Sequence, residues 1–348
     1  MSTKVRSRSK INLGLAIGPL RPDGFHRLAT LYQTLSLYDT VTVTARAADH
    51  PSISLRSTHP QVPLGPENTA WKIVQHVLNE LRLRVEVEIF IEKTLPLQGG
   101  IGAGSANAAA ALLGLEAELG QRFPIPTRFR AAAAAGSDVP LFLLGGAVLG
   151  LGRGEEVYPL PDPPSMPCVL ALPGVGVSTP RAYRDWDLLH SPSNSPAQGG
   201  ALTAAEPSSK IEELSRTLAA AFGGPGSSGI LSAGEDLAEN PLLALVRTGI
   251  ENDFEKVVFP QHPILGEIKR ILAGEPGAAD AALYAALSGS GSALFGIYSE
   301  DEAAEAALRR LRRQGIPGIV ARTLPRSQYW DSMVISDPTP APRFPGTT

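Results

Sequence analysis

The 348-residue sequence predicts a fold that mixes β-strands with α-helices and is divided into two domains. Some segments alternate apolar and polar residues, as half-buried strands do, while others repeat apolar residues at helical spacing. The length allows two domains or one large one. Proline content rises from about Pro159, which favours a boundary near residues 155–163. We therefore expect an N-terminal domain over 1–158 and a C-terminal domain over 159–325.

The N-terminal part shows both kinds of pattern in turn. Residues 10–46 alternate glycine-rich turns with apolar runs, and 39–45 within them has the period-two character of a strand. Residues 67–81 carry apolar side chains at helical spacing. Residues 85–93 place valine and isoleucine on one face and glutamate on the other, which predicts a half-buried strand. A glycine-rich turn and a helix from about Ser105 follow.

The C-terminal part has fewer but similar signals. The run CVLALPG at 168–174 predicts a buried strand, and 252–272 predicts helix around a proline. Residues 286–298 read as a Gly/Ser turn that leads into a strand. Residues 300–314 have the spacing of an amphipathic helix.

Two segments are expected to lack a packed fold. Residues 191–234 are rich in Ser, Pro, Gly and Ala, with one helical island near 210–222, and predict a long low-complexity insertion. Residues 326–348 are expected to form a disordered tail.

Composition excludes several classes of function. A formal net charge of -3 gives no strong electrostatic case for a nucleic-acid partner. The single cysteine, Cys168, excludes an intramolecular disulfide and a cysteine-cluster zinc site, which fits a cytoplasmic location. The N-terminus lacks the apolar core of a signal peptide. The apolar run VPLFLLGGAVLGLG is shorter than the roughly 18 residues of a membrane-spanning helix and predicts buried core. No membrane partner is therefore expected, and the oligomeric state stays open.

The most informative stretch is LPLQGGIGAGSANAAAALLGL, from Leu95 to Leu115. Glycine permits positive φ and lets a ligand approach the backbone N–H groups, and a helix N-terminus adds unpaired donors and partial positive charge. Together these features favour an anion, most often phosphate. The alternative is a tight strand-to-helix turn that binds nothing. Four glycines, Gly99, Gly100, Gly102 and Gly104, favour the phosphate site.

The spacing excludes the two commonest phosphate loops. No G-K-[ST] follows, and the third glycine of a dinucleotide fingerprint is replaced by Ser105 or, counting from Gly102, by Asn107. The remaining pattern, P-x-x-x-G-[LI]-G-x-[GS]-S-x-[NA] from Pro96 to Asn107, resembles the ATP loop of the GHMP kinase superfamily. Members of that superfamily phosphorylate small-molecule alcohols.

Four further stretches resemble one family within it, the 4-(cytidine 5′-diphospho)-2-C-methyl-D-erythritol kinases. They are SKINLGLAIGPLRPDGFHRLATLYQTLSLYDTV, AGSDVPLFLLGGAVLGLGRGEEV, PGVGVSTPRAY and LSGSGSALFGIY. The resemblance covers about residues 8–300 in order. It implies an α+β, two-domain GHMP kinase architecture, with a ribosomal protein S5 domain 2-like N-terminal domain, a ferredoxin-like C-terminal domain and an active-site cleft between them.

The resemblance also implies a reaction. The γ-phosphate of ATP passes to the 2-hydroxyl of the methylerythritol moiety, in the non-mevalonate route to isoprenoid precursors. ATP chemistry needs Mg²⁺ to neutralise charge. No dedicated protein cage for a metal is visible in the sequence, so we expect phosphates and water to hold the ion.

The resemblance makes Asp138 the catalytic base and places Lys10 beside it. Taken alone, Asp138 in GSDVP could be a helix cap or turn residue, and Lys10 could be a solvated charge. An ammonium at Lys10 would hold Asp138 ionised and favour negative charge that develops on the nucleophile or γ-phosphate.

Further family positions are expected to contact the substrates. In the family, the histidine matching His26 hydrogen-bonds the cytosine and the aromatic matching Tyr183 stacks on it, whereas an isolated histidine here would be read as a surface residue. Phe25 and Tyr32 could equally be core aromatics. The expected substrate-binding residues are Asn12, Phe25, His26, Tyr32, Thr179, Pro180 and Tyr183. The expected ATP-binding residues are Asn68, Lys93, Pro96, Leu97, Gln98, Gly99, Gly100, Ile101, Gly102, Ala103, Gly104, Ser105 and Ala106.

Three loop positions differ from the family pattern. Gln98 replaces a small residue, Ala103 replaces a glycine and Ala106 replaces a serine. Alanine at position 103 would be strained if that position required positive φ, and Ala106 lacks a hydroxyl for phosphate. These differences bear on ATP affinity more than on the class of reaction.

Two other functions stay open at this point. One is another small-molecule GHMP kinase, of the homoserine or mevalonate type, which would not need His26 and Tyr183 arranged around a pyrimidine. The other is a catalytically silent GHMP-fold binding protein, for which loss of Lys10 or Asp138 would be the sign. Both residues are present.

Overall fold

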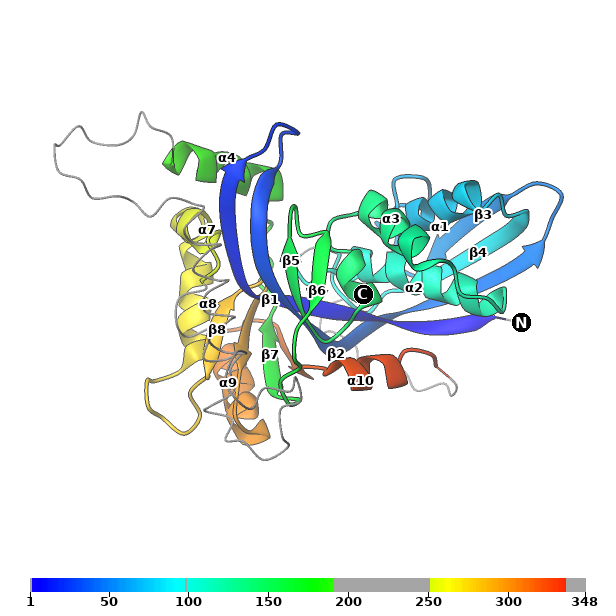
Figure 1. Cartoon of the computed structure of the whole chain (residues 1–348). Helices are drawn as coiled ribbons and strands as arrows, with labels where there is room; N and C mark the ends of the chain where they lie inside the picture. The colour runs from blue at the N-terminus through cyan, green and yellow to red at the C-terminus, as the bar shows by residue number, and fades with distance from the viewer. Residues whose placement is uncertain (1, 98, 191–250, 336–348) are drawn as a thin grey trace, which may run out of the picture.

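The computed structural model describes residues 2–97, 99–190 and 251–335 (Figure 1). Its strands are β1 (Thr3–Leu20), β2 (His26–Ala47), β3 (Ser52–Ser57), β4 (Val85–Glu92), β5 (Ala147–Leu151), β6 (Glu156–Pro159), β7 (Pro167–Ala171), β8 (Tyr284–Leu287), β9 (Leu294–Ile297) and β10 (Gly318–Arg322). Its helices are α1 (Thr69–Glu80), α2 (Ala103–Glu118), α3 (Ile125–Ala135), the 3₁₀ turn η1 (Pro140–Leu143), α4 (Thr179–Leu189), α7 (Glu255–Gln261), α8 (Pro263–Ala273), α9 (Asp301–Arg313) and α10 (Arg326–Asp331).

Two sheets build two lobes (Figure 1). The N-terminal sheet runs in the order β3-β4-β2-β5-β6, with β1 paired to β2. Helices α1, α2 and α3 cover it and share one apolar core with it. The strands expected at 39–45 and 85–93 and the helix expected at 67–81 are confirmed. Helix α2 begins at Ala103, slightly before the expected start.

Strands β1 and β2 form a long antiparallel hairpin that runs through both lobes. Of the glycine turns expected within residues 10–46, the one at Gly24 is present between β1 and β2, whereas Gly14 and Gly18 lie inside β1. The pairing register shifts between Asn12 and Gly14 and again between Ile17 and Leu20. Glycine inside a strand often marks such a bulge, which bends the strand without ending it.

The C-terminal sheet is antiparallel, in the order β10-β7-β9-β8. Numbered by its own four strands, this order is 4-1-3-2, with helices between β7 and β8 and between β9 and β10, as in a ferredoxin-like fold. All five residues of β7 are buried. Cys168 and Leu170 pack with the middle of the hairpin, whereas Val169 packs with the helices on the opposite face. The expected α+β, two-domain architecture is confirmed.

The remaining C-terminal elements also follow their sequence patterns. The strand expected at 168–174 and the amphipathic helix expected at 300–314 are present as β7 and α9. The helical segment 252–272 is split into α7 and α8 at His262, just before Pro263. Proline cannot donate the hydrogen bond that would continue the first helix.

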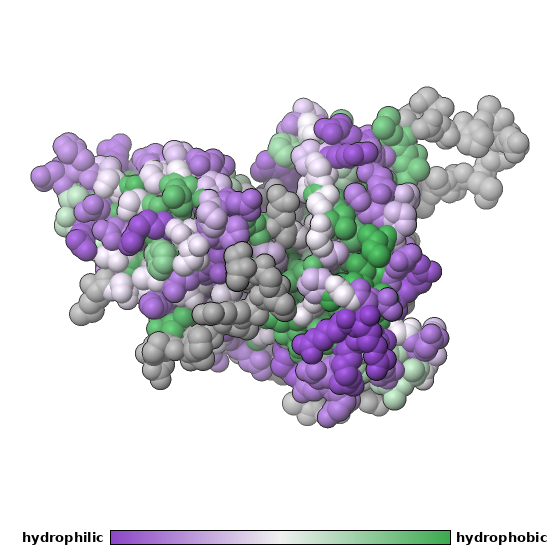
Figure 2. Space-filling view, turned by 180° about the vertical axis from the view of Figure 1, so that it is seen from behind, coloured by the Kyte–Doolittle hydropathy of each residue, from purple (hydrophilic) through white to green (hydrophobic). Residues whose placement is uncertain are grey.

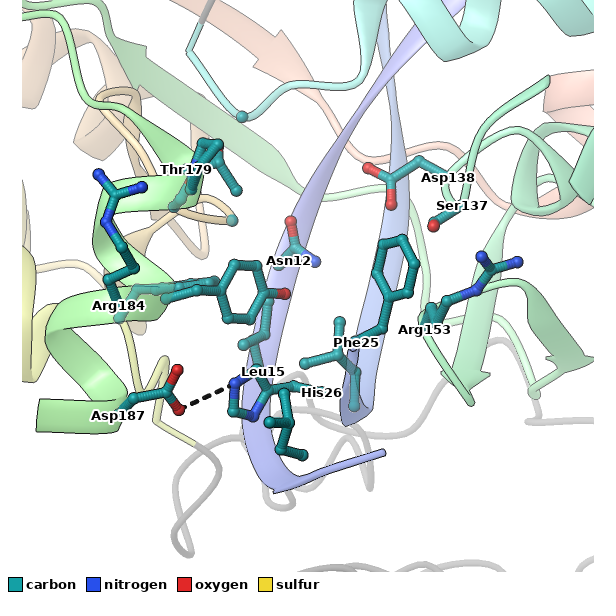
Figure 3. Close-up of a pocket in the computed structure, with 18 of the residues that line it drawn as sticks. Asn12, Leu15, Phe25, His26, Ser137, Asp138, Arg153, Thr179, Arg184 and Asp187 are labelled. Carbon is teal, nitrogen blue, oxygen red and sulfur yellow. Dashed lines mark hydrogen bonds and ion pairs between the residues drawn. The ribbon is translucent and has the colours of Figure 1, made fainter. Parts of the chain in front are cut away.

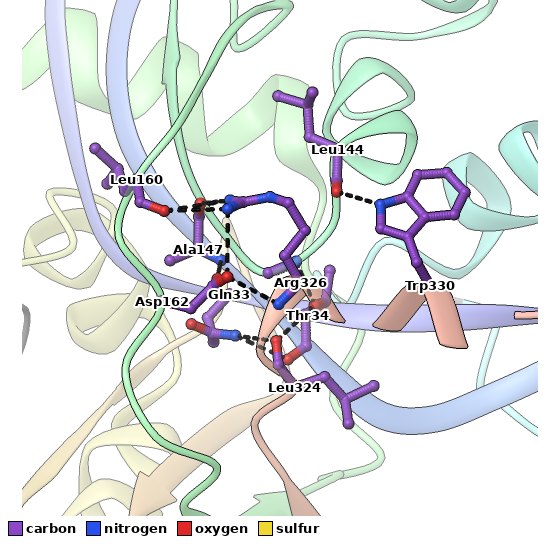
Figure 4. Close-up of polar contacts among 10 residues, drawn as sticks. Gln33, Thr34, Leu144, Ala147, Leu160, Asp162, Leu324, Arg326 and Trp330 are labelled. Carbon is purple, nitrogen blue, oxygen red and sulfur yellow. Dashed lines mark hydrogen bonds and ion pairs between the residues drawn. The ribbon is translucent and has the colours of Figure 1, made fainter. Parts of the chain in front are cut away.

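The disorder expected from residue 326 onwards is wrong for 326–335. Residues 326–331 form α10, in which Tyr329 is buried and donates from its hydroxyl to the Phe142 carbonyl at 2.7 Å. Trp330 Nε1 donates to the Leu144 carbonyl at 2.9 Å (Figure 4). Two aromatic side chains that bury against the N-terminal lobe outweigh the polar, proline-containing composition of the surrounding sequence.

Arg326 fixes the start of α10. Its Nη2 donates to the Ala147 carbonyl at 2.8 Å, and its backbone N–H donates to Asp162 Oδ2 at 2.9 Å (Figure 4). The last segment of the described chain is thereby tied to β5 and to the connection between the two lobes.

Several predictions lie outside the described residues: the insertion at 191–234 with its helical island, Gln98, and the tail from 336 to 348. The precise domain limits stay a prediction. Viewed from behind, the surface of the two lobes is mostly polar, with apolar side chains gathered near the middle of the view (Figure 2). In the described ranges, no helix is long and apolar enough to cross a membrane.

Candidate active site

The glycine-rich turn leads directly into α2. Gly102 is the N-cap with φ +72°, and no side chain caps the helix. The first backbone bond of the helix runs from the Ala106 N–H to the Gly102 carbonyl at 2.9 Å. A helix start of this kind leaves N–H groups available to an anion. A Cβ at Gly102 would lie 2.9 Å from Lys10 Cγ, so glycine also allows Lys10 to pass close to the loop.

A second glycine turn packs against the first. The Ser288 hydroxyl donates to the Gly100 carbonyl at 3.0 Å, and the Ala293 N–H donates to the Gly99 carbonyl at 3.1 Å. Gly100 has φ +77°, and a Cβ there would lie 2.0 Å from the Ser288 carbonyl oxygen. The two lobes therefore meet at their glycine turns, and no larger residue fits at Gly100.

Lys10 and Asp138 form an ion pair with 3.2 Å between Nζ and Oδ2. The Lys10 side chain is 3% exposed and that of Asp138 is 32% exposed, so a ligand can reach the pair from the Asp138 side. Lys10 Nζ also donates to Asn12 Oδ1 at 2.6 Å. Asn12 Nδ2 in turn donates to Thr30 Oγ1 at 2.8 Å. Lys10 is thus held by neighbours on the hairpin.

Tyr32 holds the other oxygen of the same carboxylate. Its hydroxyl donates to Asp138 Oδ1 at 3.0 Å. Burial, followed by the Asp138 charge, raises the pKa of Tyr32 well above its ordinary value, so the phenol stays a donor. Asp138 itself lies in the turn before η1, where a turn residue was the alternative expectation.

An aromatic site lies at the far end of the pocket, where α4 meets the tip of the hairpin (Figure 3). The rings of His26 and Tyr183 are stacked at 5.3 Å between centroids and 8° between planes. Phe254 meets Tyr183 edge-on. His26 Nδ1 lies 2.9 Å from the Gly18 carbonyl, which only accepts, so this nitrogen carries a proton. His26 Nε2 is buried and makes no hydrogen bond among the described residues, although it lies 3.0 Å from Asp187 Oδ1.

One pocket of about 640 Å³ joins these groups. Both predicted catalytic residues line it, and so do all seven predicted substrate-binding residues: Lys10, Asp138, Asn12, Phe25, His26, Tyr32, Thr179, Pro180 and Tyr183. A second pocket of about 570 Å³ shares Gly100, Thr179, Pro180 and Ser290 with the first. Gly99, Gly100 and Gly291 bring both glycine turns to this second pocket.

Two of the predicted ATP-binding side chains have other partners. Lys93 is buried in an ion pair with Asp39, whose other oxygen accepts the Thr94 and Leu95 N–H groups at 2.8 Å. Asn68 caps α1 through the Ala70 N–H and donates to the Pro63 carbonyl. Neither residue lines the two pockets.

The alanines of the loop are buried. Ala103 does not have positive φ; among described non-glycine residues only Arg82 does, so the strain considered for Ala103 is absent. Ala106 is 2% exposed and belongs to the core beneath α2. Its methyl group packs against protein, so the serine of the family pattern would also place its side chain against protein at this position.

Sequence reasoning missed several residues that line the main pocket. They are Leu15 and Leu28 on the β1–β2 hairpin, the charged residues Arg153, Arg184 and Asp187, and Ser137, Phe254 and Ser290. Arg153 lies over the Phe25 ring, 5.0 Å from its centroid. Asp187 follows Tyr183 by four residues on α4, so the helical period from Tyr183 was a signal that could have found it. Arg184, the residue next to Tyr183, had no such signal from it.

No metal ligand cluster is found within the described ranges: no three His, Cys, Asp or Glu side chains come together there as a metal site would require.

Two known domain families match parts of this chain, and curated relatives match most of it. The GHMP kinases N terminal domain family matches residues 68–146, and the GHMP kinases C terminal family matches residues 235–317. A 4-diphosphocytidyl-2-C-methyl-D-erythritol kinase of Solibacter usitatus (strain Ellin6076) is 36% identical over 315 residues, which cover 88% of this chain and 84% of the relative. A second, of Moorella thermoacetica (strain ATCC 39073 / JCM 9320), is 34% identical over 315 residues, which cover 90% of this chain and 96% of the relative.

Solved structures show the same architecture. A crystal structure of 4-(cytidine 5′-diphospho)-2C-methyl-D-erythritol kinase superposes with a TM-score of 0.63 at 27% identity, over 92% of this chain and 98% of that one. A homoserine kinase from Cytophaga hutchinsonii ATCC 33406 superposes with a TM-score of 0.62 at 19% identity, over 93% and 94%. At that identity the second likeness supports the fold alone.

Proposed function

The chain belongs to the 4-diphosphocytidyl-2-C-methyl-D-erythritol kinases of the GHMP kinase fold, and from this membership we propose how its pocket carries out the reaction. The activity is ATP-dependent phosphorylation of 4-(cytidine 5′-diphospho)-2-C-methyl-D-erythritol at its 2-hydroxyl, in the non-mevalonate route to isoprenoid precursors. The observation that carries the mechanism is the Lys10–Asp138 pair in a pocket whose other end is aromatic.

Asp138 is the base that accepts the proton of the attacking hydroxyl. As that oxygen bonds to the γ-phosphorus of ATP, the bond from phosphorus to the oxygen of ADP breaks. Lys10 and Tyr32 each donate to Asp138, which fixes the direction of the carboxylate, and its lone pairs still leave room for the hydroxyl. Positioning and electrostatic stabilisation supply most of the catalysis in phosphoryl transfer.

Lys10 has a second role in this proposal. Its ammonium is nearly buried, so its charge acts at low effective dielectric on the negative oxygens of the transferred group. Asn12 and the close passage beside Gly102 hold Nζ in place before substrates arrive.

The loop binds ATP through its backbone. Three features support backbone N–H contacts to phosphate. The start of α2 is uncapped, Gly100 and Gly102 have positive φ, and the methyl groups of Ala103 and Ala106 are buried. Ser105, in the first turn of α2, is the nearby hydroxyl. Lys93 and Asn68 support the site indirectly, by holding the strand before the loop and the start of α1.

Mg²⁺ fits this chain only as an ion held mainly by phosphates and water. Among the described residues, two carboxylates line the main pocket, Asp138 and Asp187, and Asp138 is already paired with Lys10. When bound with ATP, the ion supplies neutralisation of phosphate charge.

His26 and Tyr183 hold the cytosine. Tyr183 brings an aromatic ring into the pocket beside His26, and bases stack on such rings. The buried Nε2 of His26 makes no hydrogen bond among the described residues, and a base edge would supply one. A cytoplasmic location and the lack of a nucleic-acid partner stay predictions.

A substrate panel tests the assignment. ADP release is measured with Mg·ATP and the cytidine-diphospho-methylerythritol substrate, and in parallel with homoserine and with mevalonate. Turnover with the cytidine substrate alone is the expected result. Turnover only with another alcohol would contradict the substrate, and a folded, ATP-binding protein that turns over none would favour a silent binder.

A further inference from the structure

Arg184 lies on the face of α4 that borders the main pocket and has no part in the mechanism above. Four residues of α4 at helical spacing share this face and line the pocket: Pro180, Tyr183, Arg184 and Asp187. In Figure 3 the guanidinium of Arg184 lies above Asp187, at the level of Thr179. Side chains on a helix lean toward its N-terminus, which agrees with that direction.

The described lining of this pocket holds three lysine or arginine side chains, and Arg184 differs from the other two. Lys10 is paired with Asp138 at the end where the phosphate is transferred. Arg153 Nε donates to Glu155 Oε1 at 3.1 Å. Within the described parts of the chain, Arg184 is exposed and makes no ion pair or hydrogen bond. Its guanidinium donors are therefore available to a ligand in the pocket.

The direction of the Arg184 side chain leads away from the base site. Thr179 lines both the main pocket and the second pocket, where the two glycine turns meet. A guanidinium at the level of Thr179 therefore lies between the aromatic end, where Tyr183 stands, and the glycine turns.

The proposed substrate carries an anionic group across this part of the pocket. Its cytosine lies with Tyr183 and its attacking hydroxyl lies beside Asp138, so the diphosphate that links the two halves lies between them. Both phosphates of such a link are ionised at neutral pH. Moving these charges out of water is costly unless charged or polar groups of the protein replace the water. A guanidinium suits this role because two of its parallel N–H groups match two phosphate oxygens.

We propose that Arg184 binds the diphosphate of the cytidine substrate and makes the pocket select nucleoside diphosphate derivatives over uncharged nucleosides. The inference rests on the proposed function, because it takes the two ends of the pocket as the base site and the transfer site. Arg184 touches the link between the two halves of the substrate and none of the reacting atoms, so it is a binding residue.

The test measures inhibition by cytidine 5′-diphosphate and by cytidine, each in competition with the cytidine-diphospho substrate at saturating Mg·ATP. The two inhibitors share the base and the ribose, and only the first carries the diphosphate. In Arg184→Gln we expect the inhibition constant of cytidine 5′-diphosphate to rise by about tenfold or more. The inhibition constant of cytidine should stay within about twofold of wild type, because its contacts at the base are unchanged.

Steady-state kinetics of the same variant gives a second measure. The KM for the cytidine-diphospho substrate should rise, whereas the KM for ATP should stay within about twofold of wild type. Arg184→Lys keeps the charge and loses the paired donors, so it is expected to restore part of the affinity for cytidine 5′-diphosphate.

Arg181→Gln is the matched control. Arg181 lies on the same helix, is 65% exposed, pairs with Asp185 at 3.6 Å and does not line the main pocket. Its substitution removes the same charge from α4 and should leave both inhibition constants unchanged.

An unchanged inhibition constant for cytidine 5′-diphosphate in Arg184→Gln, or an equal rise for both inhibitors, would overturn the proposal. So would a rise that Arg181→Gln reproduces, because it would show a general effect of charge on α4. A wild type that neither phosphorylates the cytidine-diphospho substrate nor binds cytidine 5′-diphosphate would instead contradict the proposed function. Arg184 is exposed, so the variant is expected to fold, and Arg184→Ala supplies the same comparison if it does not.

Discussion

At the scale of single residues, the site depends on charges that are held by several neighbours. Lys10 contacts Asp138 and Asn12, and Asp138 is held on its other oxygen by Tyr32. The sequence motifs identified all four residues. The Tyr32–Asp138 bond was not predictable, because the two residues are 106 positions apart and only the tertiary fold brings the turn before η1 next to β2.

Tyr32→Phe should lower kcat by about tenfold and leave the affinity for ATP nearly unchanged. The substitution keeps the ring but removes one charge-assisted hydrogen bond to the base, a loss of about 1–2 kcal/mol. Steady-state kinetics measures it, with Tyr38→Phe on the same strand as a control outside the pocket. A variant with wild-type kcat would show that the hydroxyl does not orient Asp138.

At the scale of elements, two glycine turns from different lobes meet at the part of the cleft that we propose binds phosphate. The first was predicted as a phosphate loop from its composition, and the second was predicted as a turn into a strand within a stretch that resembles the kinase family. Their contact, through Gly99, Gly100, Ser288 and Ala293, could not be predicted from local patterns, because it depends on how the sheets pack.

Gly100→Ala should raise the KM for ATP at least about tenfold and lower the melting temperature by several degrees. The new Cβ meets the Ser288 carbonyl oxygen at 2.0 Å in a backbone with φ +77°, so both turns must move. ATP titrations and thermal unfolding measure the two effects.

Gly174→Ala serves as the control, since a Cβ there meets nothing within 4 Å. If Gly100→Ala behaved like this control, the close contact between the turns would be wrong.

At the scale of the whole molecule, the two lobes are joined by elements that contribute to the apolar cores of both. Leu15, Ile17 and Leu28 of the hairpin belong to the core of the C-terminal lobe, and α10 returns to the N-terminal lobe. The two-domain class was predictable from length and motifs. The long hairpin and α10 were not, because glycines and prolines locally favour turns and only tertiary burial of their apolar neighbours overrides that preference.

Tyr329→Ala should cost about 3–5 kcal/mol of unfolding free energy, and Tyr329→Phe about 1 kcal/mol. Alanine leaves a cavity beside Gly145, where the ring packs, whereas phenylalanine loses only the bond to the Phe142 carbonyl. Urea unfolding of the two variants measures the difference. Equal and small losses would mean that α10 contributes little to the stability of the fold.

The central claim is that Asp138 removes the proton of the attacking hydroxyl beside Lys10. Single-turnover phosphoryl transfer with Asp138→Asn tests it most directly, with binding of ATP and of the cytidine substrate measured separately. We predict a fall in the transfer rate of about 10²–10⁴-fold, with both dissociation constants within about threefold of wild type. A variant that binds both substrates and keeps more than about a tenth of the wild-type rate would contradict the account.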